Sequence, residues 1–253
     1  MLTRSDFHIH ATFYRLRKKD AAIGPTVREQ VDVAMANGME KIGIVEHCNY
    51  AAHHPFHCLV KLGQEFRQLK LELGKFFLGV EADLLADGQD SCGVYGRQRL
   101  GLDYVIASSH VGPGQQSQLS AYLKEEHRRI CLALAENDNV EVIGHPFAGG
   151  SRYERSGIIP QWHFGLVPTE MLDEIVNLAK KSGKALEVNY SRMEDPAYQE
   201  FLQTMREKQV LFSIGSDAHD TGRQKKALQI HAMLQQMGFQ KKCQWQPKTK
   251  RLL

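Results

Sequence analysis

Short apolar runs alternate with longer amphipathic stretches along almost the whole chain. The runs have the length of buried strands, whereas apolar residues in the longer stretches recur at helical spacing. The pattern predicts seven strands, at residues 6–10, 42–45, 76–80, 104–107, 140–143, 185–190 and 210–214. It predicts helices at residues 25–37, 58–74, 120–136, 169–181, 196–208 and 224–237. Strands that alternate with helices in this way form a parallel sheet.

Residues of the kinds that bind metals follow most of these strands. They are His8 and His10 within the first strand and, beyond the ends of later strands, Glu46, His47, Glu81, Asp83, His110, His145, Asp217 and His219. In a closed β/α barrel the site forms at the carboxyl ends of the strands all around the ring, whereas an open doubly wound sheet gathers its site at one switch point. Ligands after six different strands favour the closed barrel, with the open sheet as the alternative.

The length and composition fit a single domain. With 253 residues, of which 42% are hydrophobic, the chain can form one sizeable core. No linker or internal repeat divides it, so we expect one domain over residues 1–238 and a basic tail over residues 239–253. The tail carries five positive charges, and the rest of the chain then has a formal charge of −2. This gives no general case for nucleic-acid binding.

The cysteines and the amino terminus indicate in which cellular compartment the protein is found. The five cysteines are widely spaced and form no Cys-x-x-Cys motif, which is typical of a reduced cytoplasmic chain. The first strand begins almost at the amino terminus and leaves no room for a signal peptide. No apolar run approaches the roughly 18–20 residues of a membrane span. We therefore expect a cytoplasmic protein that does not cross a membrane.

The first strand carries the plainest chemical signal. Residues 6–10 read Asp-Phe-His-Ile-His, so His8 and His10 project from the same face. Neutral imidazole is the commonest metal ligand in proteins, and two on one face can converge on one ion. Mixed imidazole and carboxylate ligands suit zinc, manganese or iron.

The order of these residues resembles that of the PHP family, the polymerase-and-histidinol-phosphatase domain. The matching motifs are Asp6-Phe7-His8-Ile9-His10, Val45-Glu46-His47, Gly79-Val80-Glu81, Ser108-Ser109-His110, Gly144-His145-Pro146 and Gly215-Ser216-Asp217-Ala218-His219. The resemblance implies a distorted (β/α)7 TIM-like barrel with its site at the C-terminal ends of the strands. It also implies two or three divalent transition-metal ions (Zn, Mn or Fe) and the hydrolysis of phosphate esters.

The resemblance also implies the ligands residue by residue. A first ion would be held by His8, His10, Glu81 and Asp217, a second by Glu81, His110 and His145, with Glu81 bridging, and a third by His47 and His219. The expected catalytic residues are Glu81, Asp217 and His219. The chain departs from the family pattern after the first strand, where no acid occurs before Asp20. The third site is then short of a ligand, and His53 or His54 either substitutes or belongs to a solvated loop.

Three arginines are candidates to bind the phosphate. Two cations roughly 3.5–4 Å apart can hold a hydroxide for attack on phosphorus and clamp the departing oxygen. Arginine can neutralise the remaining oxygens with paired hydrogen bonds. Arg192, just past the sixth strand, is the first candidate for this role, and Arg155 and Arg152, in the long stretch of residues 146–168, come next.

Three further carboxylates lie close to expected ligands in the sequence, and a fourth falls inside a predicted strand. Asp6, Glu46 and Asp83 could orient a neighbouring metal ligand, although acids at strand ends are also common on exposed surfaces. Glu187 falls inside an apolar strand. Because an unpaired carboxylate is costly there, we expect Glu187 to have a partner.

The leading hypothesis is a phosphatase that acts on a small phosphomonoester, similar to histidinol phosphatases. Related domains process nucleic acid, so a phosphodiesterase or nuclease is an alternative, supported here only by the basic tail. An amidohydrolase barrel also opens with His-x-His, but it usually has a metal-bridging lysine where this chain has His110 and His145. A metal-bound module without catalysis is the last alternative. The expected partner is a small phosphorylated substrate, and the sequence leaves the oligomeric state open.

Overall fold

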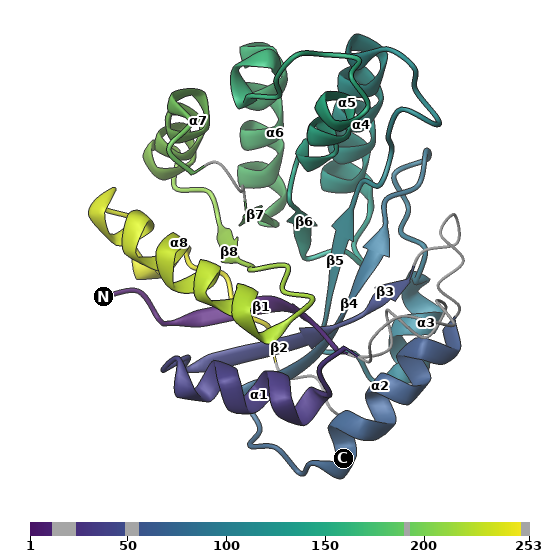
Figure 1. The fold of residues 1–253 in the computed structure, drawn as a ribbon, viewed down its shortest axis with the longest axis vertical. Helices are drawn as coiled ribbons and strands as arrows, with labels where there is room; N and C mark the ends of the chain where they lie inside the picture. The colour runs from purple at the N-terminus through teal and green to yellow at the C-terminus, as the bar shows by residue number, and fades with distance from the viewer. Residues whose placement is uncertain (12–23, 49–55, 190–192, 249–253) are drawn as a thin grey trace.

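The computed structural model describes residues 1–11, 24–48, 56–189 and 193–248. Seven parallel strands lie side by side in the order in which they occur along the chain (Figure 1). They are β1 (Ser5–His10), β2 (Lys41–Val45), β4 (Phe76–Asp83), β5 (Tyr104–Ser108), β6 (Val142–Gly144), β7 (Ala185–Val188) and β8 (Phe212–Ile214). A two-residue strand, β3 (His47–Cys48), follows β2 and pairs with β4. The parallel sheet predicted from the alternating pattern is confirmed.

The barrel closes where the chain leaves β8. Ala218 forms an isolated parallel bridge with Ile9 of β1, and the His10 amide donates a hydrogen bond of 3.0 Å to the Ala218 carbonyl. The barrel is therefore closed by a few backbone hydrogen bonds beyond the end of β8, and not by a full pairing of β8 with β1. The predicted distorted (β/α)7 barrel is confirmed, and the open doubly wound sheet is excluded because the two ends of the sheet meet.

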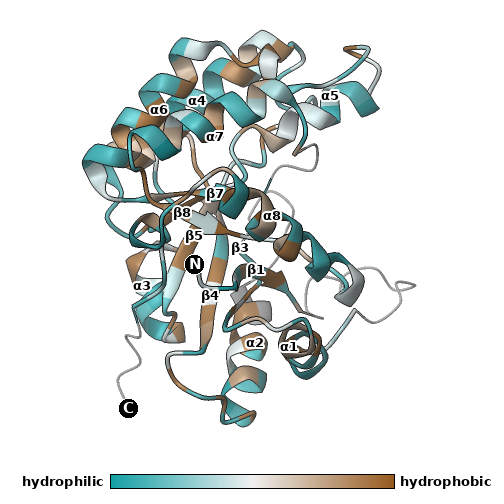
Figure 2. Ribbon diagram, turned by 90° about the vertical axis from the view of Figure 1, so that its left-hand side faces the viewer, coloured by the Kyte–Doolittle hydropathy of each residue, from teal (hydrophilic) through white to brown (hydrophobic). Residues whose placement is uncertain are grey.

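Helices cover the outside of the barrel. They are α1 (Val27–Ala36), α2 (Phe56–Gln68), α3 (Gly93–Leu100), α4 (Leu119–Glu136), α5 (Ser151–Arg155), α6 (Thr169–Ser182), α7 (Pro196–Glu207) and α8 (Lys225–Gln236), with 3-10 helices at Ala148–Gly150, Phe164–Leu166, Thr221–Gln224 and Lys241–Cys243. Figure 2 shows mainly hydrophobic strands inside helices that carry both apolar and polar residues, as expected for helices with one buried face. No helix in the described ranges has both the length and the apolar composition that crossing a membrane requires.

Local sequence explains where two of these helices begin. Thr26 caps α1: its hydroxyl accepts a hydrogen bond from the Glu29 amide (3.2 Å), and the Glu29 carboxylate accepts one from the Thr26 amide (2.8 Å). Asp195 caps α7 by accepting from the Ala197 amide (3.1 Å), and Pro196 occupies the first helical position.

Aromatic side chains fill the barrel below its carboxyl end. The ring of Phe7 meets those of Phe77 and Tyr104 edge to face, at centroid distances of 5.9 and 6.2 Å. Tyr104 crosses the interior and donates a hydrogen bond of 2.6 Å to the Phe7 carbonyl. A Cβ atom at Gly79 would lie 2.4 Å from the Tyr104 ring, so only glycine fits there. The interior is a packed core, so a site within the barrel forms at its carboxyl end.

Residues 239–247 pack against the opposite end of the barrel. Gln244 is buried, accepts a hydrogen bond from the Thr3 amide (2.8 Å) and donates one to the Thr3 carbonyl (2.6 Å). The Trp245 ring lies edge to face on Tyr104, with centroids 5.6 Å apart. Gln244 and Trp245 thus contact the barrel, and the boundary between the domain and a basic tail at residue 239 stays a prediction.

Candidate metal centre

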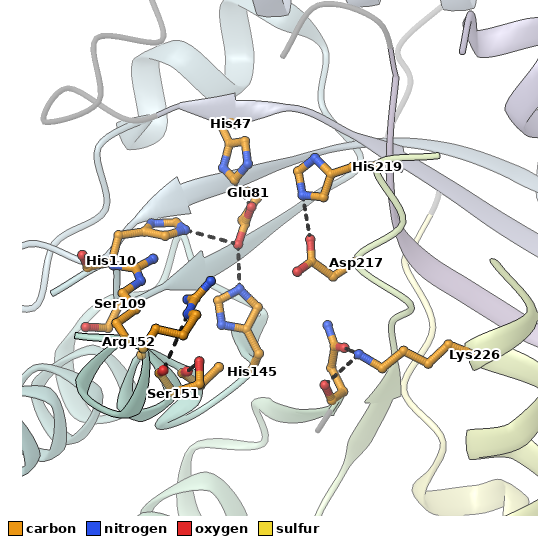
Figure 3. A pocket seen from close by; sticks show the side chains of 14 residues that line it. His47, Glu81, Ser109, His110, His145, Ser151, Arg152, Asp217, His219 and Lys226 are labelled. Carbon is orange, nitrogen blue, oxygen red and sulfur yellow. Dashed lines mark hydrogen bonds and ion pairs between the residues drawn. The ribbon is translucent and has the colours of Figure 1, made fainter. Parts of the chain in front are cut away.

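Eight metal-ligand candidates meet at the carboxyl end of the barrel, around a cavity of about 300 Å³. They are His8 and His10 on β1, His47 on β3, Glu81 on β4, and His110, His145, Asp217 and His219 just beyond β5, β6 and β8. Figure 3 shows the side chains of His47, Glu81, His110, His145, Asp217 and His219 gathered around one space. They converge because parallel strands of a barrel all end at the same rim.

A first group of ligands surrounds the ends of His8 and His10. The two Nε2 atoms lie 3.1 Å apart, and each is 3.4 Å from Oε2 of Glu81. Oδ1 of Asp217 lies 3.7 Å from His8 and 3.3 Å from His10. Ligand atoms placed tetrahedrally at about 2.0–2.1 Å from a zinc ion are about 3.3 Å from one another. The four side chains therefore fit a single divalent ion.

Glu81 faces a second group with its other oxygen. Oε1 lies 2.8 Å from Nε2 of His145 and 3.6 Å from Nε2 of His110, while Nδ1 of His47 is 2.8 Å from Oε2. Burial alone would raise the pKa of Glu81, but the imidazoles of His47 and His8 hold this pKa well below its usual range. A buried carboxylate that stays charged between two groups of donors is suited to bridge two ions.

His219 completes a third group with His10 and His47. Its ring stacks on that of His10 with a centroid distance of 4.2 Å, and its Nε2 lies 3.1 Å from Oδ1 of Asp217. Burial lowers the pKa values of His47 and His219. A lowered pKa favours the neutral imidazole, which is the form that binds a metal. His47 contributes to the second and the third group, so the groups share ligands more than the sequence predicted.

Three of the histidines have a carboxylate at the ring nitrogen Nδ1, on the side away from the cavity. The pairs are His8 with Glu187 (2.7 Å), His10 with Glu46 (3.3 Å) and His110 with Asp83 (2.5 Å). Such a carboxylate fixes the ring orientation and directs Nε2 toward the metal. The sequence indicated Glu46 and Asp83 for this role, but it assigned Glu46 to the adjacent His47, whereas Glu46 contacts His10. The partner that it required for Glu187 is His8.

Asp6 on β1 links this strand to the residues that follow β8. One carboxylate oxygen of Asp6 accepts hydrogen bonds from the amides of His8 (3.1 Å) and Ser216 (3.0 Å). Burial raises the pKa of Asp6 to about 6. Next to this junction, a Cβ atom at Gly215 would lie 2.0 Å from Oε1 of Glu187. Glycine at this position lets β8 approach the carboxylate that holds His8.

Two ligand candidates lie in backbone conformations that are rare for residues other than glycine. His145 has a φ of 27° and Asp217 a φ of 53°, and Phe147, two residues after His145, has a φ of 61°. Such conformations cost about 1–3 kcal/mol each and persist only where the surroundings fix them. The buried Glu126 of α4 does this for the turn after His145, because it accepts a hydrogen bond of 2.6 Å from the Phe147 amide.

Cationic side chains line the cavity beside the metal ligands. Arg152 and Arg155 come from α5, and Arg152 donates a hydrogen bond of 2.8 Å to the His110 carbonyl. Lys226 comes from α8 and donates to the Asn189 carbonyl at 2.9 Å, and burial lowers its pKa. Arg192, the first arginine candidate from the sequence, lies outside the described residues, as do His53 and His54.

Lys226 and Asn189 were missed by the sequence reasoning. Lys226 belongs to a Lys225-Lys226 pair on a predicted helix, which is the usual pattern of a solvated surface. The only signal was its place at the start of the helix that follows Asp217 and His219, since that end of the helix lies at the mouth of the barrel. Asn189 directly follows β7 and could have been included with the residues at other strand ends.

The barrel and its cluster of imidazoles and carboxylates define a protein of the metal-dependent hydrolase class. Residues 6–191 match the family model described as the PHP domain. The chain belongs to the PHP domain family.

The chain is also similar in sequence to two curated proteins and in fold to a solved structure. It is 26% identical over 226 residues to the DNA polymerase/3'-5' exonuclease PolX of Bacillus subtilis (strain 168), covering 86% of this chain but 34% of that protein. It is also 26% identical over 202 residues to a protein of Acetivibrio thermocellus named "Probable phosphatase", covering 77% of this chain and 73% of that one. The chain thus spans about a third of the PolX relative.

The solved structure is that of a histidinol phosphate phosphatase from Lactococcus lactis, complexed with zinc, L-histidinol and phosphate. The TM-score is 0.59 with 18% identity, and the match covers 95% of both chains. At this level of identity the comparison shows a shared fold.

Proposed function

We propose that this protein is a phosphatase that uses two or three divalent ions to hydrolyse a small phosphomonoester in the cytoplasm. The observation that carries the proposal is the position of Glu81, whose two oxygens face different groups of histidines beside a cavity lined by cationic side chains. This arrangement suits a bridging carboxylate and an anionic substrate. Zinc, manganese and iron all fit the nitrogen and oxygen donors.

The proposed roles of the ligands follow the groups of side chains. His8, His10, Glu81 and Asp217 would hold one ion, Glu81, His110 and His145 a second, and His47 with His219 would contribute to a third. When bound, a pair of such ions lowers the pKa of water and neutralises charge on the phosphate. The chain itself keeps Glu81 and Asp217 charged, since imidazoles hold the pKa values of both well below their usual range against the effect of burial.

The phosphate oxygens are proposed to bind Arg152, Arg155 and Lys226. Figure 3 shows Arg152 and Lys226 reaching the cavity from different elements, with His145 and Asp217 between them. Hydrogen bonds from charged donors to a phosphate are short and strong, and the guanidinium group can make two at once. Arg192 stays a prediction for the same role.

The size of the cavity supports a small leaving group. Its volume of about 300 Å³ lies at the lower end of small-molecule sites. The Lactococcus lactis protein with the same fold was solved with L-histidinol and phosphate, which supports a phosphomonoester. The match to PolX favours the second candidate, an exonuclease or phosphodiesterase acting on nucleic acid.

The test is a comparison of substrates on one preparation loaded separately with zinc, manganese and iron. Phosphomonoesters, including histidinol phosphate, would be compared with a phosphodiester and single-stranded DNA by kcat/KM. We expect a monoester to be the best substrate. A diester or DNA hydrolysed with a tenfold higher kcat/KM than every monoester, about 1.4 kcal/mol in the transition state, would establish the second candidate instead.

A further inference from the structure

A second group of metal-binding side chains lies outside the barrel, between α4 and α6. These two helices run side by side on the outer layer of the molecule (Figure 1). His127 and Cys131 stand one turn apart on α4, and Glu174 faces them from α6. None of the three contributes to the barrel site.

Two of the three ligand-atom distances in this group match those around a tetrahedral metal ion, and all three atoms lie within 4.8 Å of one another. Nε2 of His127 lies 3.4 Å from Sγ of Cys131 and 3.3 Å from Oε2 of Glu174. With metal–sulfur bonds of about 2.3 Å and metal–nitrogen and metal–oxygen bonds of about 2.0–2.1 Å, tetrahedral ligand atoms are about 3.6 Å apart for the N···S pair and about 3.3 Å for the N···O pair. Residues four apart on a helix share one face, so the pair on α4 needs no rearrangement to converge on an ion.

The exposure of the three side chains suits a bound ion. The His127 ring is mostly shielded from solvent, with 17% of its side chain exposed, whereas Glu174 is 57% exposed and leaves the ion a route from solvent.

We propose that His127, Cys131 and Glu174 bind a divalent ion of the zinc type at the junction of α4 and α6. One thiolate, one imidazole and one carboxylate are all ligands that zinc accepts, and water would fill the fourth position. The site is separate from the barrel centre and does not depend on the proposed phosphatase activity. Its ion would fasten the helix that carries Glu126, the residue that holds the turn after His145.

Cobalt binding tests the proposal, because only this site offers a thiolate among the clustered ligands of the described residues. The whole chain would be loaded with cobalt(II), and its metal content and absorption spectrum compared with those of Cys131→Ser and Glu174→Gln. We expect the wild type to show a thiolate-to-cobalt charge-transfer band and to hold one more equivalent of cobalt than Cys131→Ser. Glu174→Gln should weaken binding at this site at least tenfold.

Matched variants separate the proposal from its competitor, a plain ion pair between His127 and Glu174. Glu170→Gln removes an exposed carboxylate one turn earlier on α6, and Cys243→Ser removes a thiol elsewhere, so both should keep the band and the full cobalt content. A band that persists in Cys131→Ser, or equal cobalt content in Cys131→Ser and the wild type, would overturn the site. Glu174 is exposed, so its variant tests the proposal even if Cys131→Ser folds poorly.

Discussion

Glu187, at the end of β7, engages both of its carboxylate oxygens. Oε1 lies 2.7 Å from Nδ1 of His8, and Oε2 accepts a hydrogen bond of 2.9 Å from the His145 amide. Burial would raise the pKa of Glu187, but the charge of the His8 imidazole lowers it. One carboxylate therefore positions ligand candidates on two other strands.

Replacing Glu187 with Gln should weaken metal binding without unfolding the chain. The amide keeps the size of the side chain but loses the charge that holds His8, and the loss of such a partner typically lowers metal affinity 10–100-fold. Equilibrium dialysis followed by elemental analysis measures the change. Glu200→Gln, on the exposed side of α7, is the control and should bind metal like the wild type. Wild-type affinity in Glu187→Gln would show that the carboxylate does not orient His8.

Because Glu126 is buried, the free energy of unfolding of the metal-free protein should fall as the pH rises. Burial raises its pKa from 4.5 to about 7, so between these values the folded state holds a proton that the unfolded state has released. The stability linked to this proton is complete below pH 4.5 and is lost as the pH rises through 7. Glu126→Gln keeps an acceptor for the Phe147 amide and has no proton to lose.

Denaturant unfolding at pH 5 and pH 8 measures this effect. Over that range the wild type should lose about 2–3 kcal/mol of unfolding free energy relative to Glu126→Gln. Glu136→Gln, which removes an exposed carboxylate at the end of α4, should not reproduce the difference. A constant gap between wild type and Glu126→Gln at both pH values would mean that Glu126 titrates normally.

At the scale of elements, α5 carries Arg152 and Arg155 to the cavity. Neither arginine is a metal ligand candidate, so we expect them to act on the substrate. Arg152→Ala should leave the metal content unchanged and reduce kcat/KM for the preferred phosphoester about 10- to 100-fold, which corresponds to roughly 1.5–3 kcal/mol for a hydrogen bond to a charged group. The control is Arg128→Ala, an exposed arginine on α4 paired with Glu125. A loss of metal together with activity would instead point to the support that Arg152 gives to the His110 carbonyl.

The sequence predicts the strands, the long helices and the metal-ligand candidates better than it predicts the other residues that line the cavity. Strands and long helices follow from local periodicity, and the ligand candidates lie at strand ends because barrel geometry requires it, so both could be predicted. The contribution of Lys226 could not, since it depends on how α8 packs over the end of β8. Likewise, nothing local distinguishes Trp245 from a solvated residue in a basic stretch, because its partners precede it by more than a hundred residues.

At the scale of the whole molecule, Trp245 ties the end of the chain to the base of the barrel. Its ring meets Phe7 and Tyr104 edge to face, at 5.5 and 5.6 Å. Trp245→Ala should lower the free energy of unfolding by about 2–4 kcal/mol, since it removes a large side chain from a packed cluster. Trp245→Phe, which keeps an aromatic ring, should lose less than half as much. Equal stability of the alanine variant and the wild type in denaturant unfolding would show that this end of the chain does not support the barrel.

The aromatic cluster of Phe7, Phe77 and Tyr104 also determines by which route substrate and products can reach or leave the site. These side chains fill the described barrel below the metal ligands, so nothing can pass along its axis. A substrate must enter by the rim, and both products must leave by the same opening. In the proposed reaction on a phosphomonoester, released phosphate would occupy the place that the next substrate needs. We therefore expect inorganic phosphate to inhibit that reaction in competition with the substrate.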